Sequence, residues 1–358
     1  MSTLTNSTTL FTPTKLGRIA LANRIVMAPM TRSRAETDDR VSQLHVDYYS
    51  QRASAGLIIT EGTHPSVNAK GYCRTPGIYN QAQIDAWRLV TDKVHANGGK
   101  IVCQIMHCGR VAGVSNKAIG AETLAPSAIH CNEKIFTEEG MVDMPPPRAL
   151  RLDEMPGIIE EHRQATENAF IAGFDGVELH CTSGYLMAQF LSTGTNHRQD
   201  EYGGSLQNRL RLVLEVLQAM ASVDGADRVG MRICPGNPFN DLYDDNPSET
   251  FIALLKQVNA LSLAYLHVIR MKATGIDNVA LAKAHFTGPI VVNDSYKLEE
   301  AQQVVTTNGA TAVSFGRWFV ANPDLVERLR SGAELNRMDG RTLYSPGPEG
   351  YVDYQMLS

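Results

Sequence analysis

The sequence predicts an α/β fold, a (β/α)8 TIM barrel with an excursion between its third and fourth strands. Short β-branched apolar runs alternate with longer amphipathic stretches, and eight such pairs follow one another along the chain. Runs this apolar are typical of parallel strands that are covered on both faces. We expect a single domain over residues 1–358, since barrels of this kind commonly run to about 250 residues or more.

The two kinds of element are told apart by length and by the period of their apolar residues. The expected strands are residues 24–28, 57–61, 100–106, 176–180, 229–233, 265–269, 290–293 and 312–316. The expected helices are residues 41–54, 81–96, 154–172, 206–221, 247–261, 276–284, 297–307 and 323–330.

Polar side chains at the carboxyl ends of most strands favour a closed barrel over an open sheet. Glu61 ends the second strand, Gln104 lies in the third, His180 ends the fourth, and Arg232 lies near the end of the fifth. A doubly wound open sheet is the alternative, but it would gather its polar residues at one switch point. This distribution predicts an active site at the carboxyl ends of the barrel strands.

The third and fourth strands are separated by more chain than one crossover helix needs. The excess spans residues 109–150 and keeps apolar residues such as Ile135, Phe136 and Met141. We interpret this segment as a lid that folds over the mouth of the barrel; a disordered linker is the alternative.

Charge and composition exclude several classes of partner. The chain has 33 Lys and Arg against 38 Asp and Glu, a net charge of −5, and no clustered basic run of the kind that binds nucleic acid. No apolar run approaches the roughly 20 residues that span a bilayer. Residues 1–10 lack the features of a secretion signal, and the 6 scattered cysteines fit reduced thiols, so a cytoplasmic location is expected.

The end of the eighth strand carries a candidate phosphate site. Gly316 allows close approach to the backbone, and Arg317 beside it supplies a cation. The loops after strands seven and eight are the usual phosphate site of barrel enzymes, which suggests a phosphorylated cofactor.

Motifs along nearly the whole chain, in one order, resemble the old yellow enzyme family of FMN-dependent ene-reductases. They are LFTP (10–13), LANRIVMAPMTR (21–32), ITEGT (59–63), GY (71–72), CQIMH (103–107), GYL (184–186), QFL (189–191), DEYGGS (200–205), NR (208–209), FGR (315–317), ANPDL (321–325) and GYVDY (350–354). The match is to the classical type of this family, with serine at one substrate-binding position.

The resemblance implies a barrel that binds FMN without a covalent bond and oxidises NADPH or NADH. It implies that FMN then passes hydride to the β-carbon of an activated alkene, an α,β-unsaturated carbonyl or nitro compound. Such a cycle needs a cation and amide or hydroxyl partners at the flavin ring and a clamp for its phosphate. The implied cofactor-binding residues are Pro29, Met30, Thr31, Gly62, Gln104, Arg232, Ser295, Gly316 and Arg317.

The resemblance also implies the substrate-binding and catalytic residues. Hydride addition builds negative charge on the carbonyl oxygen of the substrate, so donors are needed there; His180 and Ser183 match those positions. Tyr185 matches the proton donor to the α-carbon. The implied lining of the substrate pocket comprises Tyr72, Met106 and Tyr351, together with His180 and Ser183.

Three positions depart from the family pattern. Ser183 stands where the family usually has Asn or His, and its hydroxyl reaches less far than an amide or imidazole. Met106 stands where many relatives have Trp, which would widen or reshape the pocket. Asp294 stands in the phosphate loop, where a carboxylate is unfavourable unless it points away or binds Lys or Arg.

Other interpretations stay open. Singly, Arg232 could be a salt-bridged strand end, Gln104 a satisfied core amide and Tyr185 an ordinary aromatic at the mouth. Cys103, His107 and Cys108 lack an indicated fourth ligand, so no metal site is predicted. Quinone or nitrate-ester reduction, isomerisation of a pathway intermediate, flavin binding with weak turnover, and a metal-dependent hydrolase are the alternative functions. The oligomeric state, monomer or dimer, is left open.

Overall fold

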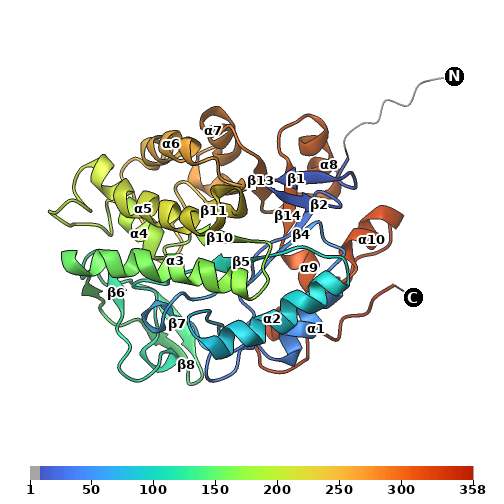
Figure 1. The fold of residues 1–358 in the computed structure, drawn as a ribbon, viewed down its shortest axis with the longest axis horizontal. Helices are drawn as coiled ribbons and strands as arrows, with labels where there is room; N and C mark the ends of the chain where they lie inside the picture. The colour runs from blue at the N-terminus through green and yellow to red at the C-terminus, as the bar shows by residue number, and fades with distance from the viewer. Residues whose placement is uncertain (1–8, 358) are drawn as a thin grey trace.

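A computed structural model describes residues 9–357 of the chain and shows a closed barrel of eight parallel strands (Figure 1). The strands are β3 (Ile25–Met27), β4 (Leu57–Ile59), β5 (Ile101–Ile105), β10 (Gly176–His180), β11 (Val229–Ile233), β12 (Tyr265–Ile269), β13 (Ile290–Asn293) and β14 (Ala312–Phe315). Each pairs with the next in sequence, and β14 pairs with β3 to close the ring. The predicted fold class is therefore confirmed; the prediction on a secretion signal falls largely on residues 1–8, outside the described residues.

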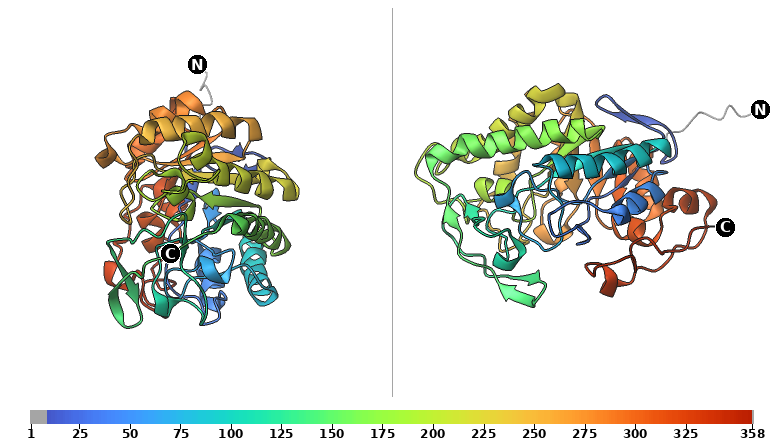
Figure 2. Two further views of the ribbon diagram at one scale, coloured as in Figure 1. Left: turned by 90° about the vertical axis from the view of Figure 1, so that its left-hand side faces the viewer. Right: turned by 60° about the horizontal axis from the view of Figure 1, so that its bottom comes forward.

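Helices lie outside the barrel at each of the predicted places (Figures 1 and 2). They are α1 (Gln43–Gln51), α2 (Gln81–Ala96), α3 (Met155–Ile171), α5 (Leu206–Asp224), α6 (Pro247–Val258), α7 (Asn278–His285), α8 (Leu298–Thr306) and α10 (Leu325–Ser331). Two short helices, α4 (Leu186–Leu191) and α9 (Arg317–Ala321), were not predicted. Single 3-10 turns occur at Val67–Ala69, Val114–Asn116, Leu152–Glu154, Ala226–Arg228, Asn259–Leu261, Lys272–Thr274 and Gly340–Thr342.

Polar side chains fix where several of these helices begin. The side chains of Asn80, Ser205, Asn246 and Asp277 each accept a hydrogen bond from a backbone N–H in the first turn of the helix that follows. Such a cap satisfies one of the N–H groups that a helix start leaves unpaired and stabilises the helix by about 1 kcal/mol.

A hairpin closes the amino-terminal end of the barrel. Its strands β1 (Thr14–Leu16) and β2 (Ile19–Leu21) pack against apolar residues at the bottom of the ring, including Val102 and Ala312. A larger core fills the space between the barrel and its helices. Because the hairpin covers the amino-terminal end, access to the barrel interior is left at the carboxyl ends of the strands.

The predicted excursion over residues 109–150 carries two small sheets. Strands β7 (Lys134–Thr137) and β8 (Gly140–Asp143) form a hairpin that stands out from the barrel, and β6 (Leu124–Ala125) pairs with β9 (Arg148–Ala149) (Figure 2). Ile135 packs in an apolar cluster that also contacts Tyr72 and Tyr185. The segment therefore contacts the mouth of the barrel, and its movement as a lid stays a prediction.

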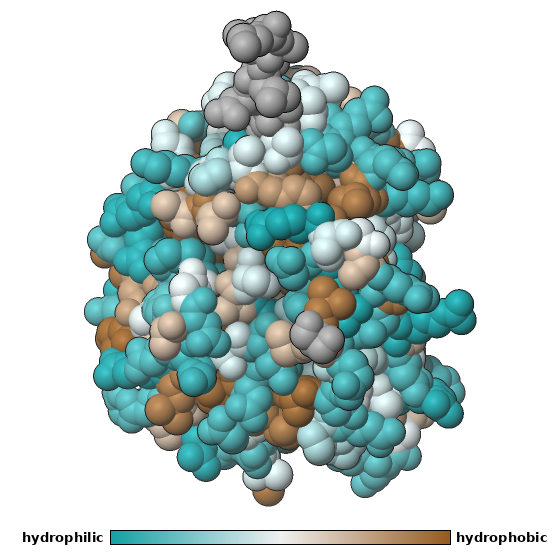
Figure 3. All heavy atoms as spheres, turned by 90° about the vertical axis from the view of Figure 1, so that its right-hand side faces the viewer, coloured by the Kyte–Doolittle hydropathy of each residue, from teal (hydrophilic) through white to brown (hydrophobic). Residues whose placement is uncertain are grey.

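The surface of the described chain is mixed in character. On the face that carries both termini, small groups of hydrophobic side chains lie among hydrophilic ones (Figure 3). Within residues 9–357, no helix is both long enough and apolar enough to cross a membrane.

Candidate active site

A cavity of about 1110 Å³ opens at the carboxyl ends of the strands. It collects polar side chains from consecutive strands: Gln104 from β5, His180 from β10 and Arg232 from β11. Strand register explains their proximity, because His180 pairs with Arg232 across β10 and β11. Of the predicted site residues, the cavity is lined by Pro29, Thr31, Tyr72, Gln104, Met106, His180, Ser183, Tyr185 and Arg232.

The polar groups at the base of this cavity fit one edge of a flavin. Arg232 Nη2 donates to Asn293 Oδ1 at 2.8 Å, and its buried Nε has no hydrogen-bond partner among residues 9–357. Gln104 Nε2 donates to Glu178 Oε1 at 2.8 Å, which leaves its Oε1 available to a ligand. An unpaired cationic N–H beside a free amide oxygen suits the uracil-like edge of FMN, which carries both acceptors and an N–H donor.

The predicted phosphate residues lie apart from this cavity lining, in the loops after β13 and β14. Arg317 Nη2 lies 3.3 Å from Ser295 Oγ, and that hydroxyl donates to Asp294 Oδ1 at 3.0 Å. The Asp294 carboxylate also forms an ion pair with Arg317 at 4.0 Å. The Asp294 carboxylate therefore pairs with an arginine, as expected for a carboxylate in a phosphate loop. The same pairing competes with a phosphate for the positive charge of Arg317.

Two backbone positions predicted to contact FMN, Met30 and Gly62, also lie outside the cavity lining. A Cβ atom on Gly62 would approach the Sδ and Cε atoms of Met106 to 2.6 and 2.5 Å. Glycine at this position therefore makes room for the side chain of Met106. Gly316 packs similarly beside Met30, whose Sδ would lie 3.2 Å from an added Cβ.

We expect Asp294→Asn to tighten FMN binding about fivefold. The amide keeps the size of the side chain and tolerates the left-handed backbone at this position, where φ is 81°. It removes a negative charge that competes for Arg317, and one exposed charge a few ångströms from a dianion is worth about 1 kcal/mol. Fluorescence titration of the apoprotein with FMN measures the gain. Riboflavin, which has no phosphate, is the control ligand; equal gains for both would contradict the explanation.

His180 is held as a neutral hydrogen-bond donor. Burial, together with nearby Arg232, lowers the pKa of its imidazole to about 3. Its Nδ1 accepts the backbone N–H of Thr182 at 3.4 Å, so the ring proton is placed on Nε2. Since His180 lines the cavity, this Nε2–H is the group it offers to a ligand.

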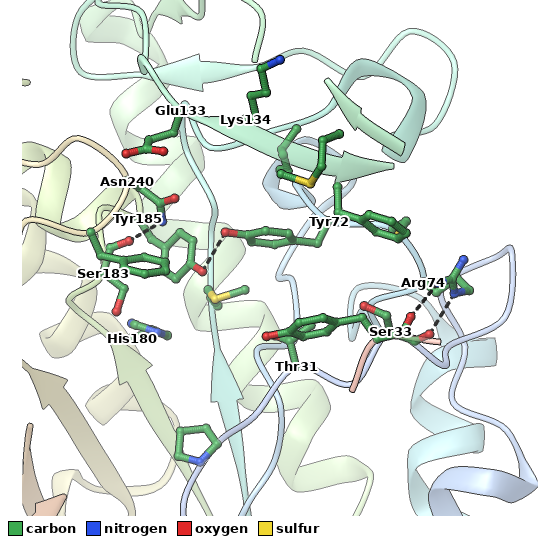
Figure 4. A pocket seen from close by; sticks show the side chains of 18 of the residues that line it. Thr31, Ser33, Tyr72, Arg74, Glu133, Lys134, His180, Ser183, Tyr185 and Asn240 are labelled. Atoms are coloured by element: carbon green, nitrogen blue, oxygen red, sulfur yellow. Dashed lines mark hydrogen bonds between the residues drawn. The ribbon is translucent and has the colours of Figure 1, made fainter. Parts of the chain in front are cut away.

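Ser183 lies beside His180 in the cavity and adopts an unusual backbone conformation (Figure 4). Its φ is 57°, in the left-handed region that favours Gly and Asn. Asn240 Nδ2 donates to the backbone carbonyl of Ser183 at 2.7 Å and fixes the turn. The Ser183 hydroxyl is thus left free of the hydrogen bonds that hold its backbone.

Tyr185 and Tyr72 point their hydroxyl groups at each other across the cavity (Figure 4). The Tyr185 hydroxyl donates to that of Tyr72 at 3.1 Å, and the ring of Tyr185 lies edge-on to His180 with centroids 4.9 Å apart. Burial raises the pKa of Tyr185 well above its usual value of about 10. The phenol is therefore protonated at neutral pH and is placed next to both predicted carbonyl donors.

The prediction that Tyr351 lines the substrate pocket is wrong. Its ring is fully buried and stacks on Tyr48, with centroids 4.0 Å apart. The guanidinium groups of Arg32 and Arg34 lie 5.1 and 4.6 Å from its centroid. Two buried arginines need the aromatic face there, and Tyr344 from the same carboxyl-terminal segment lines the cavity instead.

Several residues in and behind the cavity were not predicted from the sequence. Arg74 donates to the backbone carbonyls of Ser33 and Tyr344 and forms an ion pair with Glu138 in the β7–β8 turn, so it joins three distant segments at the mouth. Long-range contacts of this kind leave no local pattern. Glu178 was also missed, although it lies two residues before His180 on one strand, and the period of 2 places both on one side.

The cysteines give no second site. Among the described residues, all 6 are buried and free, and no group of three His, Cys, Asp or Glu could hold a metal ion. Cys181 packs in the apolar core, and burial raises the pKa of its thiol to about 12. An imidazole-activated nucleophile next to His180 is therefore not formed.

A strand-end cavity that suits a flavin ring and places a neutral imidazole and a phenol above it defines a flavin-dependent oxidoreductase of the TIM-barrel class. The profile of the NADH:flavin oxidoreductase / NADH oxidase family matches residues 9–336. The chain belongs to this family, the old yellow enzymes, and is an NAD(P)H-dependent flavin oxidoreductase that uses FMN.

Relatives match over nearly the whole chain. 12-Oxophytodienoate reductase 7 of Oryza sativa subsp. japonica is 40% identical over 97% of this chain and 94% of its own length. A Leishmania infantum protein named "Probable flavin mononucleotide-dependent alkene reductase" is 41% identical over 96% of each chain. The structure of morphinone reductase in complex with tetrahydroNAD has a TM-score of 0.92 and 43% identity and covers 98% of each chain.

Proposed function

We propose that this enzyme reduces the C=C bond of α,β-unsaturated carbonyl or nitro compounds at the expense of NADPH or NADH. The observation that carries the proposal is the grouping of His180, Ser183 and Tyr185 (Figure 4) in the cavity that Gln104 and Arg232, the groups that suit a flavin edge, also line. Bound FMN would supply the hydride chemistry, taking two electrons from the nicotinamide and giving them to the alkene. The relatives named for alkene, oxophytodienoate and morphinone reduction support this choice.

The chain's own residues would stabilise charge on the substrate oxygen. His180, at the end of β10, and Ser183, in the turn that follows, both line the cavity, where the His180 Nε2–H and the Ser183 hydroxyl can donate to a single carbonyl or nitro oxygen. The electron-withdrawing oxygen gains negative charge as the β-carbon accepts hydride, so a donor there lowers the barrier. Because the His180 imidazole is neutral, it can donate a hydrogen bond to the substrate oxygen without adding a second positive charge beside Arg232.

Tyr185 would complete the reaction by protonating the α-carbon. Its phenol stays protonated at neutral pH, and the Tyr72 hydroxyl at 3.1 Å can turn to donate to the tyrosinate oxygen that remains. Tyr72 is thus the hydrogen-bond partner of the acid. Both side chains are half-buried in the wall of the cavity, where a bound flavin and substrate would cover them further.

An anaerobic spectroscopic titration tests the proposal. The visible flavin band of the purified protein should bleach with NADPH or NADH and return when 2-cyclohexenone is added to the same cuvette. Bleaching without return on the enone would leave the flavin oxidoreductase assignment and reject alkene reduction. Comparing the two nucleotides at equal concentration identifies the preferred reductant.

Quinone or nitrate-ester reduction is the second candidate, and Ser183 with Met106 favours it. The hydroxyl of Ser183 is short, and the flexible Met106 lines a broad cavity, so acceptors that rely less on two carbonyl donors fit this pocket. Rapid return of the flavin band with a quinone, but not with 2-cyclohexenone, would favour this alternative.

We expect Ser183→Asn to speed enone reduction about tenfold. An asparagine amide reaches further than a serine hydroxyl, and Asn tolerates the φ of 57° at this position better than Ser does. One full oxyanion donor is worth about 3 to 4 kcal/mol, and Ser183 already supplies part of that. Stopped-flow reoxidation of the reduced enzyme by 2-cyclohexenone measures the change. Ser183→Ala should be slower than wild type; an Ala variant as fast as wild type would show that Ser183 donates nothing.

A further inference from the structure

A buried hydrogen-bonded chain lies behind the residues that suit the flavin edge. Glu178 is fully buried in the barrel interior, opposite Gln104 in the pairing of β10 with β5. Its Oε1 accepts from Gln104 Nε2 at 2.8 Å, and its Oε2 accepts from His267 Nδ1 at 2.9 Å. His267 Nε2 in turn lies 2.7 Å from Ser314 Oγ. The chain runs through β5, β10, β12 and β14, across the whole barrel.

The chemistry of a carboxylate fixes the direction of each bond. A carboxylate only accepts hydrogen bonds, so the Gln104 amide must present its NH2 group to Glu178. The Gln104 carbonyl oxygen is then turned to the cavity, where it can accept the N–H of the flavin edge. With its Nδ1–H on Glu178, His267 can accept from the Ser314 hydroxyl through Nε2, and burial lowers the pKa of its imidazole, which favours the neutral ring.

Glu178 is therefore a buried carboxylate that accepts one hydrogen bond from Gln104 and one from His267. Burial alone would raise the pKa of Glu178, but the interactions with His267, Arg232 and Gln104 outweigh burial and lower it. Arg232 is the cation in this set, and it lines the cavity beside Gln104. The charged groups around the chain are thus the Glu178 carboxylate, the Arg232 guanidinium and the Asp294 carboxylate, which also acts on Arg232; His180 and Tyr265 beside them are neutral.

We propose that Glu178 is a positioning residue that orients Gln104 for flavin binding and, by offsetting the charge of Arg232, lowers the reduction potential of the bound flavin. The proposal rests on the proposed function only for the identity of the cofactor. A reduced flavin carries extra negative charge at the edge that Arg232 and Gln104 suit. A carboxylate behind these residues disfavours that charge, so it makes the reduced enzyme a stronger hydride donor.

Glu178→Gln tests the charge. Removing one buried charge at several ångströms, at an effective dielectric constant of about 20, should favour the reduced flavin about tenfold in equilibrium constant. For a two-electron couple this is a rise of about 30 mV. The measurement is spectroscopic equilibration of the FMN-loaded protein with a reference dye. Glu161→Gln, at a half-buried carboxyl on α3 outside the chain, is the control and should leave the potential unchanged.

The positioning role has a separate readout in the apoprotein. Glu178→Asp keeps the charge but shortens the side chain by one methylene, so it should lose the bond to Gln104 and weaken FMN binding severalfold with little change in potential. In a Gln104→Ala background this loss should disappear, because the two residues act through one contact.

The outcomes are distinct. A folded Glu178→Gln protein with the wild-type potential, or a Glu178→Asp protein with wild-type FMN affinity, would overturn the proposal. Should Glu178→Gln fail to fold, the Glu178→Asp affinity still decides. Failure of the proposed function would be seen in a different experiment, in which the reduced flavin of the wild-type protein does not react with an enone.

Discussion

Replacing His180 by alanine should slow reoxidation of the reduced enzyme by 2-cyclohexenone about 10²- to 10³-fold. His180 Nε2–H is the longer-reaching of the two donors in the cavity, because the second position carries only the serine hydroxyl of Ser183. Removal of a single oxyanion donor typically costs about 3 to 4 kcal/mol of barrier, and here little remains to compensate. Stopped-flow absorbance of the flavin band after mixing anaerobic reduced enzyme with the enone measures the rate.

His180→Gln is the matched control for this prediction. Its amide retains an N–H donor on a side chain of similar length, so it should recover part of the lost rate. A glutamine variant as slow as alanine, in a protein that still binds FMN, would indicate that the imidazole packs the site rather than donates. An alanine variant within threefold of wild type would reject the role of His180 outright.

The pH dependence of enone reduction follows from the protonation state of His180. Burial and Arg232 lower the pKa of His180 to about 3, so the imidazole is neutral throughout the range from pH 5 to 8. A group whose pKa is depressed gains its proton only on acidification through the lowered value. The rate of enone reduction should therefore be flat over this range. A sigmoidal rise or fall centred near pH 6.5, absent in His180→Gln, would contradict this protonation state.

The barrel could be predicted from sequence because its signals are local. Eight apolar strands and the helices between them have clear periods, and strand boundaries such as Gly176–His180 and Val229–Ile233 agree with the structure. The two hairpins outside the barrel were not predicted, because they depend on contacts with distant parts of the chain. The β1–β2 hairpin is stabilised by packing under the barrel, and β7–β8 by contact with Tyr72 and Tyr185, neither of which changes the local pattern.

Within the site, strand-end chemistry could be predicted better than the geometry around it. The cavity gathers Gln104, His180 and Arg232 because parallel strands bring their carboxyl ends together. The prediction that Tyr351 lines the pocket was wrong because its ring packs in the core against the buried Arg32 and Arg34. Sequence spacing says nothing of where a carboxyl-terminal segment returns to the barrel.

Replacement of Arg232 by methionine should destabilise the apoprotein by about 3 to 5 kcal/mol. The guanidinium is buried in the barrel and its positive charge acts on Glu178, a buried carboxylate that would keep only its hydrogen bonds from Gln104 and His267. No hydrogen bond or ion pair joins the two residues directly, so the loss should lie at the lower end of the roughly 3 to 5 kcal/mol that breaking a buried ion pair costs, mainly through the charge left behind. Urea unfolding of the apoprotein measures the loss, and Glu161→Gln serves as a control for changes of buried charge elsewhere.

The charge relation between the two residues makes this prediction specific. Arg232→Met combined with Glu178→Gln removes both charges, so the double variant should regain much of the stability that Arg232→Met loses. The two single variants should also move the flavin in opposite directions: loss of the cation disfavours the reduced form, about a hundredfold in equilibrium constant, whereas loss of the carboxylate favours it. Single variants that shift the potential the same way would show that packing, not charge, governs this end of the barrel. Additive stability losses in the double variant would lead to the same conclusion, because residues whose charges are coupled give non-additive changes.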